Sequence, residues 1–263
     1  MPIFKFEAKR LIAYTFWWSA AMAASIILML PVYISMITGG QLSLSPMGTS
    51  GFFEMLGVDA NVLMKPIGVY GFLTLFLSIL SGTCGMFLGL KAFTKETVGQ
   101  TAEFTYTKPY RRGAVFLAKV LSALLSALII GAFYFFGSLI GGNANGISAD
   151  FTLFFLIGIS FLLIELFFLL FGAFLGAIHP KIRAPLLTSA GIVFMFFCLS
   201  SFSTKVKAGA LKFLTPFAYF PAADIVKTGG YNLGYLAAYC IFCILFAAIG
   251  YICFIKKDVA FIA

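Results

Sequence analysis

The sequence predicts an all-α integral membrane protein with six transmembrane helices. Its residues are 62% hydrophobic and only 10% charged, whereas a soluble domain carries about 25% charged residues to keep its surface wetted. Several apolar runs also reach the roughly 20 residues that a helix needs to cross a bilayer. These runs lack the alternation of polar and apolar residues over about ten positions that a membrane-spanning barrel requires, so helices are predicted.

The apolar runs indicate a single transmembrane domain over residues 1–263. The first run exceeds the 7–15 or so residues of a signal-peptide core, and we expect it to be retained. The fifth run is the shortest, and it begins with Pro185, at a position that helices tolerate in their first turn. The expected spans are residues 13–37, 66–90, 114–140, 151–178, 185–202 and 234–255.

The distribution of charge predicts the orientation of the spans. Most of the 18 basic residues lie in the N-terminal segment, the second-to-third and fourth-to-fifth connections, and the tail. Cytoplasmic loops carry an excess of Lys and Arg, so both termini are expected in the cytoplasm. The net charge of +9 therefore indicates contact with anionic membrane lipids. It does not indicate nucleic acid, because the basic residues do not gather on a soluble face.

The N-terminal segment, residues 3–12, has an amphipathic pattern at helical spacing. This pattern predicts a short helix that lies in the inner membrane interface. The alternative is a polar extension of the first span. The apolar stripe comprises Phe4, Ala8, Leu11 and Ile12, and the charged positions include Lys5, Glu7, Lys9 and Arg10.

The second-to-third connection, residues 91–113, is the longest cytoplasmic segment. Thr97 and Gln100 have the spacing of a capping box, and Glu96 and Glu103 flank one or two turns of predicted helix that Pro109 must stop. A helix this short is marginal alone, and docking against a partner would stabilise it. The alternative is an ordinary solvated loop.

The segment before the last span, residues 203–233, is apolar but interrupted by Pro216 and Pro221. It is too broken to cross the bilayer, so it predicts a re-entrant insertion of two half-helices in the outer leaflet. Unpaired backbone at that depth must be covered by protein, and the insertion is therefore expected to pack on the bundle.

No catalytic, cofactor-binding or metal-binding residue is predicted. The sequence has neither a metalloprotease H-E-x-x-H motif nor a phosphate-binding P-loop. Residues 48–51 resemble the serine motif of rhomboid proteases, but Ser50 and His179 are expected on opposite sides of the ~30 Å hydrocarbon core. A nucleophile and its base must approach to about 3 Å. We interpret the 5 cysteines as apolar fillers within the spans.

Glu165 is the one ionisable residue close to the centre of an expected span. A charge there costs about 2.5–3.5 kcal/mol, so it is expected to face the bundle interior, a subunit interface or a wet cavity. Its role is left open between a gating group and a hydrogen-bonded packing contact. Small residues at a four-residue spacing, namely Gly85 with Gly89 and Gly172 with Gly176, predict close helix packing within the chain.

Three stretches resemble the permease subunits of ABC-2-type transporters, as does the order of the elements. Glu103 and Phe104, followed by KPYRR at 108–112 and VFLAK at 115–119, are similar to the family's acidic residue, S-x-P-x-S-R stretch and apolar-Lys start of the third span. Thr107 and Tyr110 stand where the family has serine. LTPFAYF at 214–220 resembles the family's L-x-P-F-x-Y-F insertion, and FIKKDV at 254–259 resembles its basic-Asp tail.

The resemblance implies a bacterial cytoplasmic membrane protein in which two permease chains pair, as a homodimer or a heterodimer. A separate ABC ATPase would bind ATP and Mg²⁺, and this chain would bind no cofactor. The second-to-third helix would contact that ATPase, with Glu103 pairing a basic residue. The implied coupling residues are Glu96, Thr97, Gln100, Glu103, Phe104 and Tyr106, and the N-terminal helix would add Phe4, Lys5, Lys9 and Arg10.

The implied function is export of an amphipathic or hydrophobic cargo, such as a peptide, antimicrobial or drug. Aromatic residues in the fifth span favour such a cargo, although Phe facing lipid is the alternative explanation. The alternatives in function are an ion-coupled secondary transporter or channel, an intramembrane hydrolase, and an anchor that does not transport. The candidate path or gate comprises Glu165, Phe196, Phe197, Pro216 and Phe217.

Overall fold

The computed structural model describes residues 2–38, 60–63, 65–99, 111–144, 150–206 and 209–256. Every regular element in these ranges is helical. Within these ranges six helices are long and apolar enough to cross a membrane, which confirms the predicted all-α membrane fold. They are α1 (Pro2–Thr38), α4 (Pro66–Val98), α6 (Arg112–Ala144), α7 (Phe151–Ile178), α8 (Pro185–Val206) and α11 (Leu233–Lys256).

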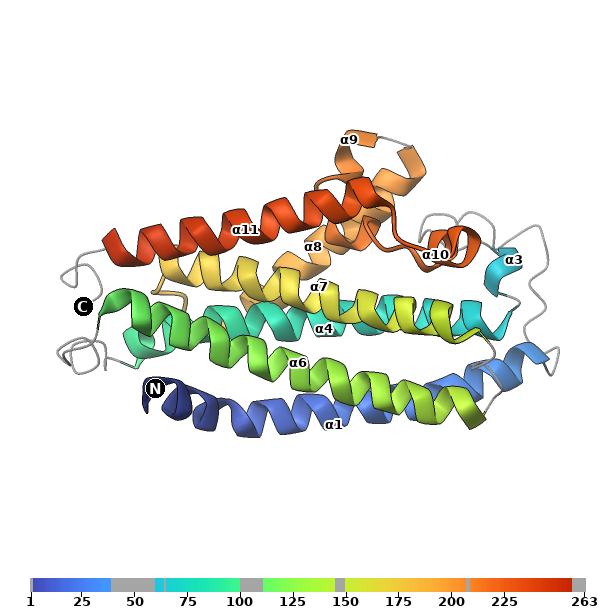
Figure 1. Ribbon diagram of the computed structural model, residues 1–263, viewed down its shortest axis with the longest axis horizontal. Helices are drawn as coiled ribbons and strands as arrows, with labels where there is room; N and C mark the ends of the chain where they lie inside the picture. The colour runs from blue at the N-terminus through green and yellow to red at the C-terminus, as the bar shows by residue number, and fades with distance from the viewer. Residues whose placement is uncertain are drawn as a thin grey trace.

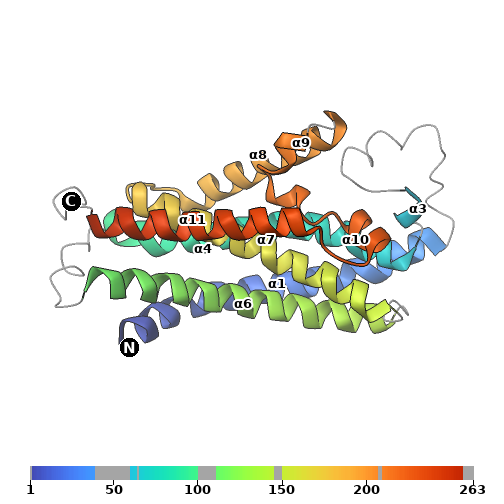
Figure 2. The same cartoon turned by 45° about the horizontal axis from the view of Figure 1, so that its top comes forward.

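The long helices are arranged around a central pair, α4 and α7 (Figure 1). Helices α1 and α6 run side by side along one flank, whereas α8 packs on α4 and α11 packs on α7. Figure 2 shows α8 leaning away from the other helices toward α9. The most apolar stretch of α4 is 78% buried, but that of α11 is only 17% buried. The outer helices therefore present most of their apolar surface to the surroundings of the chain.

Glycines bring α4 and α7 into backbone contact. A β-carbon added to Gly89 would lie 2.2 Å from the carbonyl oxygen of Leu169, and one added to Gly172 would lie 2.4 Å from that of Met86. A β-carbon at Gly85 would meet the carbonyl oxygen of Glu165 at 2.3 Å. The prediction that these glycines permit close packing within the chain is confirmed.

The N-terminal segment is continuous with the first span, so the prediction of a separate interfacial helix is wrong. Helix α1 begins at Pro2 and runs to Thr38. The i, i+4 row of Glu7, Leu11, Thr15 and Ser19 is buried along one face, while Ile12, predicted to share the stripe of Leu11, is 61% exposed. The alternative, an extension of the span, is correct because this face packs on the bundle from its first turns.

Helix α4 likewise continues beyond the predicted end of its span. It runs through Val98, and the N–H of Gly99 bonds to the carbonyl oxygen of Lys95 at 3.0 Å. Thr97 lies in the last turn of α4 and does not cap a new helix, so that expectation was wrong. The predicted helix in the connection, with Gln100, Glu103, Phe104 and Tyr106, lies outside the described residues.

The segment before α11 forms α9 (Gly209–Lys212), the 3₁₀ turn η2 (Pro216–Ala218) and α10 (Ala222–Thr228). It packs on α4, α7 and α8, as expected for a covered insertion. Burial raises the pKa of the Tyr219 hydroxyl to about 12, so it stays protonated and donates to the carbonyl oxygen of Phe213. Entry of this segment into the outer leaflet stays a prediction. The short helix α3 (Ala60–Leu63) lies at the same end of the bundle.

Candidate functional site

Four charged side chains meet between α1, α4 and α6, at the end of the bundle where α1 begins and α11 ends (Figure 1). They are Glu7 of α1, Lys95 and Glu96 of α4, and Lys119 of α6, and we call them the charge cluster. Because successive residues of a helix point about 100° apart, Lys95 reaches α1 while Glu96 reaches α6. One turn of α4 is thus ionically bonded to two other helices.

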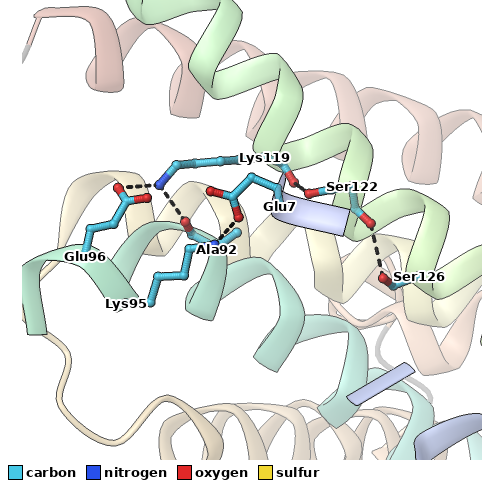
Figure 3. Close-up of polar contacts among 7 residues, drawn as sticks. All are labelled: Glu7, Ala92, Lys95, Glu96, Lys119, Ser122 and Ser126. Atoms are coloured by element: carbon cyan, nitrogen blue, oxygen red, sulfur yellow. Dashed lines mark hydrogen bonds and ion pairs between the residues drawn. The ribbon is translucent and has the colours of Figure 1, made fainter. Parts of the chain in front are cut away.

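Lys119 is the most deeply buried member of the charge cluster (Figure 3). Its Nζ donates to Glu96 Oε2 at 2.6 Å and to the carbonyl oxygen of Ala92 at 2.9 Å. It also lies 5.5 Å from the centre of the Phe93 ring, within the range of a cation–π contact. Every interaction of this ammonium group therefore joins α6 to the last turns of α4.

The cluster holds two cations and two anions, and it is shielded from solvent. The exposed fraction is 0% for Lys119 and 3% for both Glu7 and Glu96. A buried ion pair contributes little net stability compared with apolar packing, but removing one partner leaves an uncompensated charge and is strongly destabilising. The cluster therefore fixes the relative positions of three helices more than it adds to the total stability.

Two further contacts brace the same end of the bundle. Lys91 Nζ lies 3.4 Å from the centre of the Tyr14 ring, which joins α4 to α1 again. Phe93, Phe116 and Phe254 form an aromatic group, with centroid distances of 5.1 Å and 5.4 Å from Phe93 to the other two rings. Helix α11 is thereby tied to α4 and α6. The connection over residues 99–111 leaves α4 from this braced end.

The structure corrects the expected role of Glu96. Its carboxylate was expected to contact an ATPase, but it is 3% exposed and already paired with Lys119. Thr97, the next predicted coupling residue, is partly buried in the final turn of α4. Both residues therefore belong to the helix that leads into the connection.

The predicted N-terminal residues lie beside the charge cluster. Lys5, Lys9 and Arg10 are exposed on α1, while Phe4 is partly buried. Their neighbour Glu7 faces inward and pairs with Lys95. The first turns of α1 therefore expose three cationic side chains on the surface and direct one carboxylate toward α4.

Glu165 lies in the interior of the bundle, as predicted, between α7 and α4. Its side chain is 0% exposed. Ser81 Oγ donates to Glu165 Oε2 at 3.3 Å, and Oε1 has no hydrogen-bond partner among the described residues. The bond to Ser81 is of the kind expected for a hydrogen-bonded packing contact, and a gating role for Glu165 stays a prediction.

Replacing Glu165 with Gln should change the unfolding free energy by less than about 1 kcal/mol. The amide is similar in shape to the carboxyl group, and its oxygen can still accept from Ser81. Unfolding of the purified variant in mixed micelles measures this change, with Ser81→Ala as the control that removes the donor. A loss above about 2 kcal/mol on Glu165→Gln would show that a charge at this position holds the helices together.

The remaining candidate path residues form an aromatic contact around the insertion. The rings of Phe197 and Phe217 lie 5.7 Å apart, and both line a cavity of about 190 Å³ between α4, α7, α8 and the insertion. Phe196 packs instead on Phe168, at 5.8 Å, and Pro216 is buried. Glu165 does not line this cavity. Of the predicted path residues, the structure therefore brings only Phe197 and Phe217 together in the cavity wall.

Sequence reasoning missed the partner of Lys119 and the hydroxyl groups of the cavity. A lysine inside an apolar run needs a counter-charge, and that signal could have selected Glu96. Serines and threonines at i, i+3 and i+4 spacing in α4 and α8 were the signal for the cavity wall. Among the residues that the structure covers, no group of three or more His, Cys, Asp and Glu side chains is placed to hold a metal ion.

A family model described as ABC-2 family transporter protein matches residues 19–259. The chain belongs to this family. It is therefore a multi-pass membrane protein and a permease of an ABC transporter, a class of transport subunit that works with ABC ATPases. No curated protein matches the chain.

Proposed function

We propose that this chain is the permease subunit of an ATP-driven exporter and forms the membrane path for an amphipathic or hydrophobic cargo, such as a peptide, antimicrobial or drug. Membership of the ABC-2 family is the observation that carries the proposal. It also favours an ABC permease over an ion-coupled carrier, a channel or an intramembrane hydrolase. The whole chain acts as one permease domain, and a separate ATPase binds ATP and Mg²⁺.

The charge cluster supports a route for movement from the ATPase to the helices. The ATPase contacts the connection at Gln100, Glu103, Phe104 and Tyr106, and any push there acts on the end of α4. Because Lys95 and Glu96 are bonded to Glu7 and Lys119, α4 moves together with α1 and α6. The exposed cations Lys5, Lys9 and Arg10 on α1 provide a second contact for the ATPase.

The arrangement of the termini supports a cytoplasmic location for the charge cluster. The start of α1 and the end of α11 lie at the same end of the bundle (Figure 1), and the basic side chains of Lys95, Arg112 and Lys119 lie at that end as well. We place this end in the cytoplasm of a bacterial cell. The exposed apolar faces of the outer helices, with Leu187 at 76% and Phe194 at 60% exposure on α8, are available to lipid and to a second permease chain.

Reversing the charge of Glu103 tests the coupling contact. The permease is co-expressed with the ABC ATPase encoded beside it and purified through a tag on the permease. Loss of one charge-assisted contact, worth about 1.5–3 kcal/mol, should lower the amount of co-purified ATPase by roughly tenfold or more in Glu103→Arg. ATP hydrolysis in reconstituted vesicles should also lose its dependence on the permease.

The matched control is Asp150→Arg, which reverses an exposed carboxylate at the start of α7 on the opposite end of the bundle. This variant should retain the ATPase. If Glu103→Arg and Asp150→Arg retain it equally, the second-to-third connection is not the coupling contact. If the wild-type chain never retains an ATPase, the exporter proposal fails altogether.

A further inference from the structure

We propose that the cavity between α4, α7, α8 and the insertion binds an amphipathic cation, with an ammonium group held by hydroxyl oxygens and an apolar body held by aromatic rings. The cavity has a volume of about 190 Å³, and its lining residues on α4, from Gly68 to Ser78, lie near the start of that helix, whereas Lys95 and Glu96 of the charge cluster lie near its end. We call it the hydroxyl cavity. Its polar lining residues are Thr74, Ser78, Ser160, Ser200, Ser201, Thr204, Lys212, Asp224 and Tyr235.

Four hydroxyl groups of the wall, those of Ser78, Ser160, Ser201 and Thr204, present acceptors to a guest because their protons are donated to carbonyl oxygens of their own helices. Ser78 donates to the carbonyl oxygen of Thr74 at 2.6 Å, and Ser160 to that of Ile157 at 2.6 Å. Ser201 donates to the carbonyl oxygen of Phe197 at 3.2 Å. Thr204 donates to the carbonyl oxygen of Ser200 at 3.1 Å.

A hydroxyl group has one proton and two acceptor lone pairs. Once the proton is committed to a helix carbonyl, only the lone pairs remain for a guest. The hydroxyl wall therefore favours a ligand that donates hydrogen bonds. An ammonium group brings up to three donors and no acceptor, whereas a carboxylate or phosphate would find no free hydroxyl donor at these four positions.

Charged residues of the cavity lie outside its buried wall. Asp224 is exposed and Lys212 is partly exposed, and they are the two charged residues among the described residues of the lining. Asp224 attracts a cation to the cavity, and Lys212 opposes it. The buried part of the lining carries hydroxyl oxygens and apolar groups, so these determine which end of a ligand enters.

The apolar part of the lining fits the body of the same ligand. Phe197 and Phe217 pack against each other with centroids 5.7 Å apart, and Phe220 lines the same space at 5% exposure. Aromatic faces also attract cations. At about 30 Å³ per water, the cavity has room for roughly six water molecules. It therefore accommodates a head group with a short apolar stretch, and a larger amphiphile must extend out of it.

This assignment adds a ligand class to the proposed export function. It rests on that function only for the statement that the bound cation is the exported cargo. Binding itself requires this chain alone. The test is therefore made on the purified permease without an ATPase, so that its failure would leave the Glu103→Arg experiment unaffected.

The experiment uses a chain in which the five native cysteines are replaced by alanine and one cysteine is introduced at Ser201. Two methanethiosulfonate reagents of similar size are compared, one with an ethylammonium group and one with an ethylsulfonate group. The cationic reagent should react about tenfold faster, after normalisation to a cysteine at Asn143, because its ammonium group can donate to the hydroxyl oxygens of the wall whereas a sulfonate cannot. Asn143 is exposed on α6 outside the cavity lining, and Thr204→Cys is a second reporter should Ser201→Cys fold poorly.

Protection and charge removal complete the test. Hexylamine should slow the labelling of Ser201→Cys, whereas 1-hexanol and hexanoate at the same concentration should not. Adding Asp224→Asn should reduce the preference for the cationic reagent, and adding Lys212→Gln should increase it. Equal rates for both reagents, a faster sulfonate, equal protection by hexanol, or no reaction with either reagent at both reporter positions would each overturn the assignment.

Discussion

Replacing Lys119 with methionine should lower the unfolding free energy by about 3–5 kcal/mol, the largest effect that we expect from a single substitution in this chain. Methionine preserves most of the side-chain volume but removes the ammonium group. Glu96 then stays 3% exposed without its ion-pair partner. The carbonyl oxygen of Ala92 also loses the donor at 2.9 Å.

Unfolding of purified chains in mixed detergent micelles, followed by circular dichroism, measures this loss. The double variant Lys119→Met with Glu96→Gln should recover most of it, because neither member of the pair is then charged. Lys9→Met is the matched control, since it removes an exposed cation of α1 and should change the unfolding free energy by no more than about 0.5 kcal/mol. A double variant that is as unstable as Lys119→Met would show that the pair does not act as a unit.

The six spans were predictable because their signal is local. A run of about 20 apolar residues rarely forms any structure other than a membrane helix. The predicted span over residues 151–178 coincides with α7 (Phe151–Ile178). The helix ends were less predictable. Helix α4 continues through Val98 although its last turns carry Lys91, Lys95 and Glu96, which resemble a polar loop when they are considered one at a time. These residues stay helical because their charges are satisfied by α1 and α6.

The candidate site was predictable only in part, because it depends on contacts between distant residues. Lys119 lies inside the apolar run of the third span, and its partner Glu96 lies 23 positions earlier in the chain. Glu7 and Lys95 are 88 positions apart, and no short motif encodes that pairing. The sequence therefore indicated that a polar connection follows the second span, but it placed the start of that connection at residue 91, whereas α4 runs through Val98. It could not show that Glu96, expected to meet an ATPase, is used inside the permease.

The second large effect concerns the contact between α4 and α7. Replacing Gly89 with alanine should destabilise the chain by an amount near the upper end of the 1–3 kcal/mol or so that overpacking costs. The new methyl group would lie 2.2 Å from the carbonyl oxygen of Leu169 and 2.6 Å from the backbone nitrogen of Ala173. Both atoms belong to the backbone of α7 and have no rotamer that relieves the clash, so the two helices must separate.

Gly191→Ala provides the matched control for the same chemical change. Gly191 lies within α8, and a β-carbon there would meet nothing within 4 Å. Alanine favours the helix over glycine by about 0.8–1.0 kcal/mol, so this variant should be neutral or slightly more stable in the same micelle titration. Similar midpoints for Gly89→Ala and Gly191→Ala would mean that α4 and α7 lie farther apart than their backbone contact indicates. A loss confined to Gly89→Ala would instead show that the central helix pair, on which α1, α6, α8 and α11 all pack, is held at the distance that glycine alone permits.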